Sequence, residues 1–247
     1  MLTRDKMIII VFVACVACVY LLELTLISSA IIQKLQGKKG TKLLRRKSVI
    51  ALHIVATMGV LCFLYGYFIE PYRLQVNTFT IPTEKLSNAE FKIVQISDLH
   101  CDKKQRNEQK LVKLINHIEP DIIVFTGDSI NSLDALPLFK KTLTTVKAKM
   151  DKLAVRGNID IWYWSNLHLF EGTGFKVLDE NSISFEKHGE KITISGLQCE
   201  NESNLNKTLN DVSGEHFSIF LYHYPGLIES LENLNVDLYL CGHTHGG

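Results

Sequence analysis

Two kinds of apolar run alternate with polar segments along the chain. Two long runs lie near the amino end, one over residues 7–32, interrupted by Glu23, and one over residues 48–69. Each approaches or exceeds the roughly 20 residues that a helix needs to cross a bilayer. The first run could be a signal peptide, but no clear small-residue cleavage site follows it. The pattern therefore predicts two transmembrane helices within residues 1–70.

Beyond the second long run, short apolar runs alternate with amphipathic stretches. Residues 71–90 are polar and contain two prolines, so we expect a linker there. Strands are predicted at 91–97, 121–127, 152–157, 217–223 and 236–242, and a hairpin at 182–197, where HGE separates SISFEK from KITISGL. One apolar face predicts a helix over 107–119, and further helices are expected near 134–149 and 225–234. This alternation predicts an α/β fold with a largely parallel sheet, to which the hairpin adds antiparallel pairing.

The distribution of charge predicts the orientation of the chain in the membrane but indicates no nucleic-acid partner. The 247 residues carry 27 Lys plus Arg and 26 Asp plus Glu, and a net charge of +1 gives no argument for a nucleic-acid polymer as partner. The loop 33–47 is rich in lysine and arginine and contains no acid. Short basic loops stay in the cytoplasm, so residues after Pro71 are expected outside the cytoplasm. Binding of this loop to anionic lipid would give the same orientation. The chain is thus predicted to be a multi-pass cell-membrane protein with an extracytoplasmic domain.

The polar residues within the apolar runs and the spacing of the cysteines each lead to a structural expectation. Glu23 and His53 are polar residues within the membrane runs and could pair across the hairpin. Of the six cysteines, Cys101, Cys199 and Cys241 lie outside the membrane runs and are widely spaced. They form no CxxC pair, so neither a zinc ribbon nor a disulfide framework is indicated, and free thiols are expected.

Metal-ligating residue types follow the predicted strands. In open α/β sheets, side chains beyond the carboxyl ends of strands converge on a ligand site. Glycines at 127, 157 and 242 permit tight turns before several of these residues. Each fragment alone is weak evidence, because an isolated histidine such as His117 or His216 is usually just exposed. As a set they suit a pair of manganese, iron or zinc ions, and the candidate ligands are Asp98, His100, Asp128, Asn158, His223, His243 and His245.

The order of these motifs resembles the calcineurin-like metallophosphoesterase family over residues 91–247. VQISDLH and GHTHGG are similar to its membrane-tethered bacterial branch. The resemblance implies a β-sandwich flanked by helices, with a dinuclear centre above the strand ends. It also implies that one metal is held by Asp98, His100 and His245 and the other by Asn158, His223 and His243, with Asp128 bridging. Asp128 and Asn158 would be the catalytic residues. The implied substrates are phosphomonoesters, phosphodiesters or pyrophosphates, and the membrane hairpin beside the domain adds envelope or lipid-linked substrates to the expectation.

The chain departs from the family pattern after Asn158. The family usually has histidine where this chain has Ile159, which cannot donate a proton. General acid catalysis contributes roughly 10²- to 10⁴-fold in rate, so substrates with poor leaving groups should suffer most. Asp160 is expected to support the loop structurally. His168 is a weak hypothesis for a replacement acid.

The aromatic residues Trp162, Tyr163 and Trp164 leave two interpretations open. They could line the floor of a substrate pocket, or they could begin a helix and pack into the core. The second interpretation is favoured.

Three functional hypotheses remain. The favoured one is a membrane-anchored dinuclear metal phosphohydrolase. The rivals are a catalytically weak metal-binding membrane scaffold, for which Ile159 is the support, and a metal-dependent hydrolase of another bond such as an amide. Because related domains continue with further strands beyond the motif at Gly247, the β-sandwich is expected to be C-terminally incomplete, with an exposed sheet edge.

Overall fold

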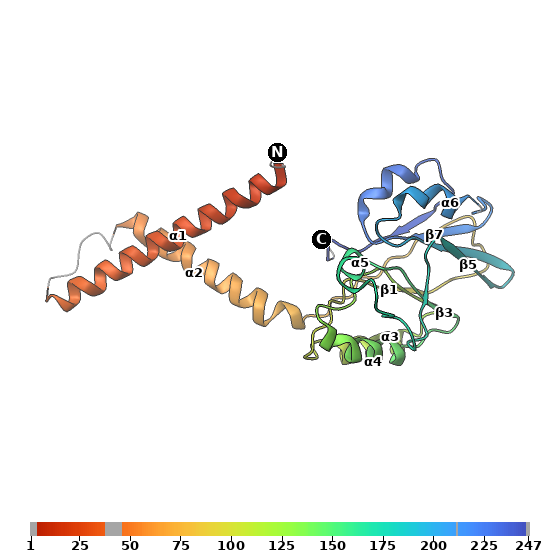
Figure 1. Cartoon of the computed structure of the whole chain (residues 1–247), viewed down its shortest axis with the longest axis horizontal. Helices are drawn as coiled ribbons and strands as arrows, with labels where there is room; N and C mark the ends of the chain where they lie inside the picture. The colour runs from red at the N-terminus through yellow and green to blue at the C-terminus, as the bar shows by residue number, and fades with distance from the viewer. Residues whose placement is uncertain (1–3, 38–45, 211, 246–247) are drawn as a thin grey trace. The chain divides into compact units, whose positions relative to one another are not determined.

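The computed structural model describes residues 4–37, 46–210 and 212–245. It divides into two compact units, Met1–Arg73 and Leu74–Gly247, which are described separately (Figure 1). The centre of the basic loop, with Lys38, Lys39, Lys42 and Arg45, lies outside the described residues, as does Gly247.

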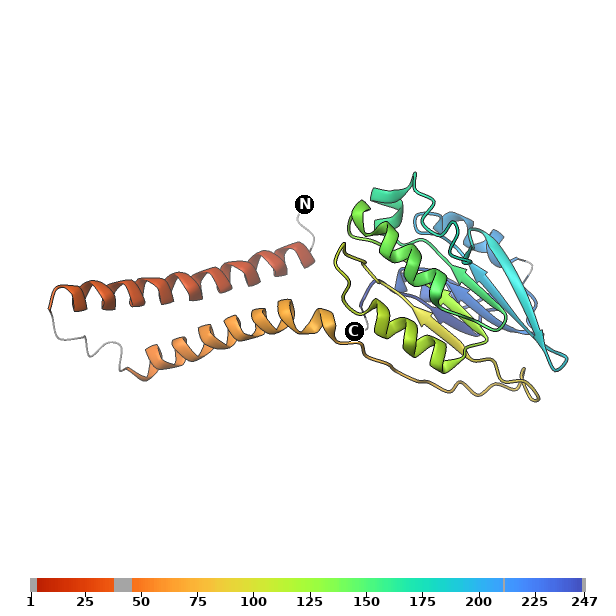
Figure 2. The same cartoon turned by 90° about the horizontal axis from the view of Figure 1, so that it is seen from below.

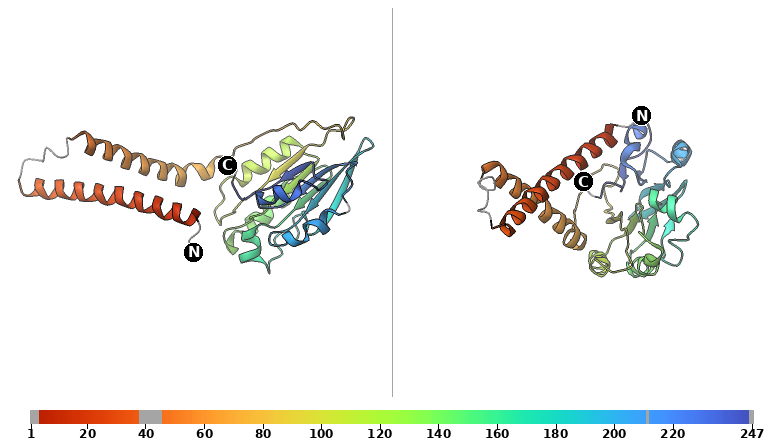
Figure 3. Two further views of the ribbon diagram at one scale, coloured as in Figure 1. Left: turned by 90° about the horizontal axis from the view of Figure 1, so that it is seen from above. Right: turned by 60° about the vertical axis from the view of Figure 1, so that its left-hand side comes forward.

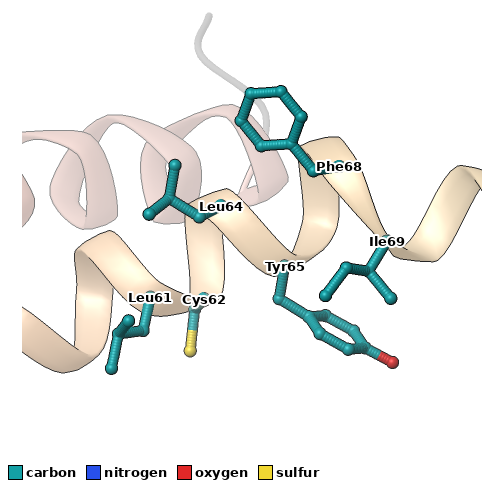
Figure 4. Close-up of a pocket in the computed structure, with 6 residues that line it drawn as sticks. All are labelled: Leu61, Cys62, Leu64, Tyr65, Phe68 and Ile69. Carbon is teal, nitrogen blue, oxygen red and sulfur yellow. The ribbon is translucent and has the colours of Figure 1, made fainter.

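The first unit contains two long helices, α1 (Arg4–Leu35) and α2 (Lys47–Phe68), followed by a short 3-10 turn, η2 (Glu70–Tyr72). By length and composition, Ile10–Leu35 and Lys47–Tyr72 could each cross a membrane. Large apolar side chains point outward from both helices; Phe12 is 67% exposed and Phe63 is 69% exposed. Figure 4 shows such a surface near the end of α2, where Leu61, Leu64 and Phe68 line a shallow apolar hollow. Apolar surface on this scale is expected of helices solvated by lipid.

Polar contacts join α1 to α2. His53 Nδ1 lies 2.5 Å from Glu23 Oε1, so the predicted pairing across the hairpin is confirmed. One turn away, the Tyr20 hydroxyl donates to the Ala56 carbonyl at 3.1 Å. Gly59 makes this approach possible, because a Cβ there would lie 2.3 Å from the Tyr20 hydroxyl. Small residues at helix–helix contacts have this role in membrane proteins generally.

The second unit is built on two four-stranded sheets. In the first, β1 (Ile93–Ile96), β2 (Ile122–Phe125), β3 (Asp151–Ala154) and β4 (Lys176–Val177) are parallel and adjacent in that order. In the second, β5 (Asn181–Lys187) and β6 (Glu190–Gly196) form the predicted antiparallel hairpin. The strands β7 (Phe217–Leu221) and β8 (Leu238–Leu240) then add in parallel. The predicted α/β fold with mixed pairing is confirmed.

Alternate residues of the buried strands face two different cores. Ile123 and Phe125 of β2 pack with Phe139 under α3 (Glu108–Ile118) and α4 (Leu136–Thr145), which cover the outer face of the first sheet (Figure 2). Ile122 and Val124 point the other way, into the core between the two sheets. A third core lies under α6 (Leu205–Leu209) and the 3-10 segment η5 (Pro225–Leu231) on the outer face of the second sheet (Figure 3). The result is the predicted β-sandwich flanked by helices.

Several predicted boundaries are wrong. The helix expected near 225–234 is instead a 3-10 segment, Pro225–Leu231, because the apolar spacing that predicts a helix does not distinguish the two hydrogen-bond patterns. The helix expected near 134–149 ends at Thr145, because Val146 is extended. The helix expected near 134–149 also begins with a 3-10 turn, η3 (Leu133–Ala135), and the short elements β4, α6 and η4 (Glu202–Asn204) were not predicted.

Candidate metal centre

The strand register brings the predicted ligands to one edge of the sandwich. Ile96, Phe125 and Ala154 are in register at the carboxyl ends of β1, β2 and β3, and the loops that follow carry Asp98, Asp128 and Asn158. In the second sheet, Leu221 is in register with Leu240, and the loops beyond carry His223 and His243. Gln95 ties the two sheets together here by donating to Thr126 Oγ1 at 2.9 Å and to the Cys241 carbonyl at 2.8 Å.

Five of the predicted side chains converge closely. The ligand atoms of Asp98, His100 and His245 lie within 4.8 Å of one another, and so do those of Asp98, Asp128 and His223. Asp128 Oδ2 is 3.6 Å from His100 Nε2 and 3.3 Å from His223 Nε2. This carboxylate therefore faces one histidine from each of the two implied ligand sets.

His243 and Asn158 border this cluster. The His243 ring lies 5.3 Å from the His223 ring, and its backbone N–H donates to Asp98 Oδ2 at 2.9 Å. Asn158 is the first residue of a short helix, α5 (Asn158–Trp164), and is buried. The next residue, Ile159, donates its backbone N–H to Asp128 Oδ1 at 2.9 Å, which holds the start of α5 against the cluster.

Among the described residues, the buried polar atoms at this edge that lack hydrogen-bond partners include two candidate ligand atoms, Asn158 Oδ1 and His223 Nε2. A buried acceptor left unpaired costs about 1–3 kcal/mol. The Nδ1–H of His223 donates to the Thr126 carbonyl at 2.7 Å, so Nε2 points into the cluster and is the lone-pair nitrogen when the ring is neutral, as it is in a metal ligand. A divalent cation would satisfy both orphaned atoms, so the residues present fit a metal ion.

The backbone of the ligand residues is strained. Asp98, His100, Asp128, His243 and His245 have φ angles of 49°, 40°, 59°, 71° and 55°. Residues other than glycine seldom adopt this left-handed region, which costs of order 1–3 kcal/mol each. Strain of this kind persists where the surrounding structure holds side chains in a required geometry.

The glycines of the three motifs are required for two different structural reasons. Gly127 has φ +102°, so the tight turn predicted there is confirmed. Gly157 and Gly242 are needed for close packing instead. A Cβ on Gly157 would lie 2.3 Å from Asp128 Oδ1, and one on Gly242 would lie 2.0 Å from Ser97 Oγ.

The buried charges of the cluster shift one another's pKa. Burial by itself raises the pKa of Asp128, but contact with His223 and the Ile159 N–H bring it below its ordinary value. Burial likewise lowers the pKa of His223, yet Asp128, the Thr126 carbonyl and Asp98 raise it overall. In the absence of metal the two groups thus stabilise each other as an ion pair, with a proton on His223 Nε2, 3.3 Å from Asp128 Oδ2; a metal ion would take the place of that proton.

Asp160 supports the loops, as expected. It is fully buried, and its carboxylate accepts backbone N–H groups from Asp128, Ser129 and Gly157 at 2.9–3.0 Å. Burial raises the pKa of Asp160, with the N–H donors acting in the opposite direction.

The favoured interpretation, that the aromatic residues of α5 pack into the core, is wrong for two of the three. Only Trp164 packs toward the core, where its Nε1 donates to the Ile130 carbonyl at 3.0 Å. Trp162 is 55% exposed and Tyr163 is 68% exposed. His168 is exposed in the loop beyond α5 and lines a surface hollow with Arg156 and Gln198.

Sequence reasoning did not identify Asn131 as a site residue. Its Oδ1 accepts from His100 Nδ1 at 3.0 Å, which leaves His100 Nε2 free for a metal. Its Nδ2 donates to the His100 carbonyl and to Asp102, which fixes the amide's orientation. The signal available was its position three residues after Asp128, in the same strand-end loop.

Comparison with known proteins agrees with this geometry. The family model for calcineurin-like phosphoesterases matches residues 91–247. The uncharacterized metallophosphoesterase YkuE of Bacillus subtilis is 33% identical over 202 residues, covering 74% of this chain and 69% of that protein. An uncharacterized metallophosphoesterase of Aquifex aeolicus is 31% identical over 193 residues, covering 72% of each. A transmembrane protein with metallophosphoesterase domain from Danio rerio is 25% identical over 225 residues, covering 82% of this chain and 50% of that protein.

Proposed function

Because the chain belongs to the calcineurin-like phosphoesterase family, we propose that it is a membrane-anchored phosphohydrolase that uses two divalent metal ions. The proposed bonds are phosphomonoesters, phosphodiesters or pyrophosphates. The observation that carries the proposal is the pair of orphaned buried atoms, Asn158 Oδ1 and His223 Nε2, at the edge where the other candidate ligands converge.

Seven side chains would hold the ions. In this proposal Asp98, His100 and His245 bind one ion, Asn158, His223 and His243 bind the other, and Asp128 lies between them. Carboxylate, imidazole and amide donors suit manganese, iron or zinc. A pair of such ions would supply the positive charge that binds the oxygens of a phosphate ester and lowers the pKa of water.

The protein's own residues orient this centre. Asn131 and the Thr126 carbonyl bind Nδ1 of His100 and His223 and so aim both Nε2 atoms inward. Asp160 fixes the loops of Asp128 and Asn158 through three backbone N–H groups. Ile159 offers no proton for the leaving group, so we expect substrates with good leaving groups to react faster.

The membrane hairpin sets where the enzyme would work. We propose residues 1–70 as two membrane spans, 71–90 as a linker and 91–247 as the catalytic domain. Two helices able to cross a membrane support this, as does the Danio rerio relative named as a transmembrane protein. The basic loop favours an extracytoplasmic catalytic domain, and a phosphorylated envelope or lipid-linked substrate is consistent with that location.

A catalytically weak scaffold is less well supported, because the candidate metal ligands are all retained. The test is hydrolysis of bis-p-nitrophenyl phosphate by the full chain in detergent, with and without manganese. We expect manganese-dependent turnover that is lost in Asp128→Ala and kept in Asp134→Ala, which alters an exposed ion pair with Lys103. Metal binding without turnover would favour the scaffold instead.

A further inference from the structure

The two sides of the candidate centre differ in chemistry. On the side of His100, the neighbours are polar, with Asn131 bonded to both His100 and Asp102. On the side of His243, the neighbour is aromatic. The Tyr224 ring meets the His243 ring edge to face, with centroids 4.6 Å apart at 81°.

The helix α5, which begins at the candidate ligand Asn158, also carries exposed aromatic side chains. Trp162 lies four residues after Asn158, and Tyr163 lies four residues after Ile159. On a helix, residues four apart are neighbours on one face, about 5–6 Å apart. The exposed surfaces of Trp162 (55%) and Tyr163 (68%) therefore lie one helical turn from the start of α5, which carries a candidate metal ligand.

The exposed indole of Trp162 is held in place. Its Nε1 donates to Glu200 Oε1, in the loop after β6. Glu200 adopts the left-handed conformation, with φ 70°. A fixed aromatic face loses less freedom on binding a ligand than a mobile one, so this arrangement is suited to contact a substrate.

The positive charge closest to Asn158 along the chain, that of Arg156, is engaged by the backbone of α5. The Arg156 guanidinium donates to the carbonyls of Asp160 and Trp164 at 2.9 Å, and so caps backbone groups of α5. The Glu200 carboxylate adds negative charge beside Trp162. This side therefore favours an apolar group over a further phosphate.

We propose that the substrate carries an apolar organic group that rests on Trp162 and Tyr163 while its phosphate lies at the metal centre. This inference rests on the proposed function, because it takes the phosphate site from it. The shared chemistry is apolar surface, which a short alkyl chain or a flat aromatic ring could both supply.

The test is binding of organophosphonates to the manganese-loaded full chain in detergent, measured by calorimetry. Methylphosphonate probes the metal centre alone, whereas butylphosphonate and benzylphosphonate add an alkyl or aromatic group. We expect both larger ligands, or benzylphosphonate alone, to bind roughly tenfold more tightly than methylphosphonate, from burial of the added apolar surface. A gain with both indicates a general apolar surface, and a gain with benzylphosphonate alone indicates ring stacking.

Trp162→Ala and Tyr163→Ala should each reduce this preference and leave methylphosphonate affinity unchanged. Both residues are exposed, so their loss should not disturb the core. Met150→Ala is the matched control, since Met150 is 39% exposed and precedes β3 at the opposite end of the sheet. An equal affinity for all three ligands, or a preference that survives in both variants, would overturn this inference alone. A failure of methylphosphonate to bind would overturn the proposed metal centre as well.

Discussion

Asp160→Ala removes the carboxylate that accepts the backbone N–H groups of Asp128, Ser129 and Gly157. The site is fully buried, so water cannot replace the lost acceptor without rearrangement. At about 1–2 kcal/mol for each orphaned N–H, within the range for unsatisfied buried groups, the substitution should destabilise the fold by about 3–6 kcal/mol. For a unit of this size, 1 kcal/mol shifts Tm by about 2–4 °C, so Tm should fall by roughly 6–24 °C.

The assay is thermal unfolding of the metal-free full chain in detergent, followed by tryptophan fluorescence. Asp160→Asn should give an intermediate loss, because one amide oxygen can replace Oδ2, which accepts two of the N–H groups, while the NH₂ faces the Ser129 N–H. Asp134→Ala is the control, since Asp134 lies in an exposed ion pair worth about 0–1 kcal/mol. If Asp160→Ala lowers Tm no more than Asp134→Ala does, the supporting role of Asp160 is refuted.

Three further predictions follow from the structure. Ile159→His should raise turnover more for alkyl phosphodiesters, by roughly 10²-fold, than for nitrophenyl phosphodiesters, because only poor leaving groups need a proton donor; equal gains would contradict this. Burial by itself raises the pKa of Asp121, but the Lys92 N–H and the Lys187 ammonium hold it below its ordinary value. Its stabilisation is therefore present above the unfolded pKa of about 3.9 and lost as pH falls through the lower folded value; Asp121→Asn should flatten Tm against pH below about pH 4, and an unchanged profile would contradict this. A double-mutant cycle of Glu23→Ala and His53→Ala should give a coupling of about 0.5–2 kcal/mol in detergent, and no coupling would mean that their 2.5 Å contact does not stabilise the hairpin.

The parts of the fold that could be predicted from the sequence are those with a strong local pattern. The strand around Ile122–Phe125 is buried on both faces, so its apolar run is continuous and its position follows directly. The helix Glu108–Ile118 has one apolar face, and the predicted bounds, 107–119, differ from it by one residue at each end. In contrast, β4 is only two residues long, and η5 differs from an α-helix by its hydrogen-bond pattern, which periodicity does not report.

The candidate site divides in the same way. Metal ligands such as Asp128 and His223 can be predicted from the sequence, because each is a metal-binding residue type that directly follows a predicted strand. Asn131 does not, because its role depends on where its amide meets His100. The exposure of Trp162 and Tyr163 was also not predictable from their apolar character, since the short helix α5 turns Ile161 and Trp164 toward the cores and leaves these two outside. The left-handed backbone of five ligand residues has only a weak signal in the sequence, because Asp and His enter this region more often than other non-glycine residues but still seldom.

The central claim is that one edge of the sandwich holds two metal ions. The most direct test is the metal content of the full chain after manganese loading and removal of free ion, compared between the wild type and Asn158→Ala. We predict two ions per chain in the wild type and no more than one in Asn158→Ala, because Asn158 Oδ1 is a buried acceptor with no other partner. One ion or none in the wild type, or two ions retained without Asn158, would contradict the account.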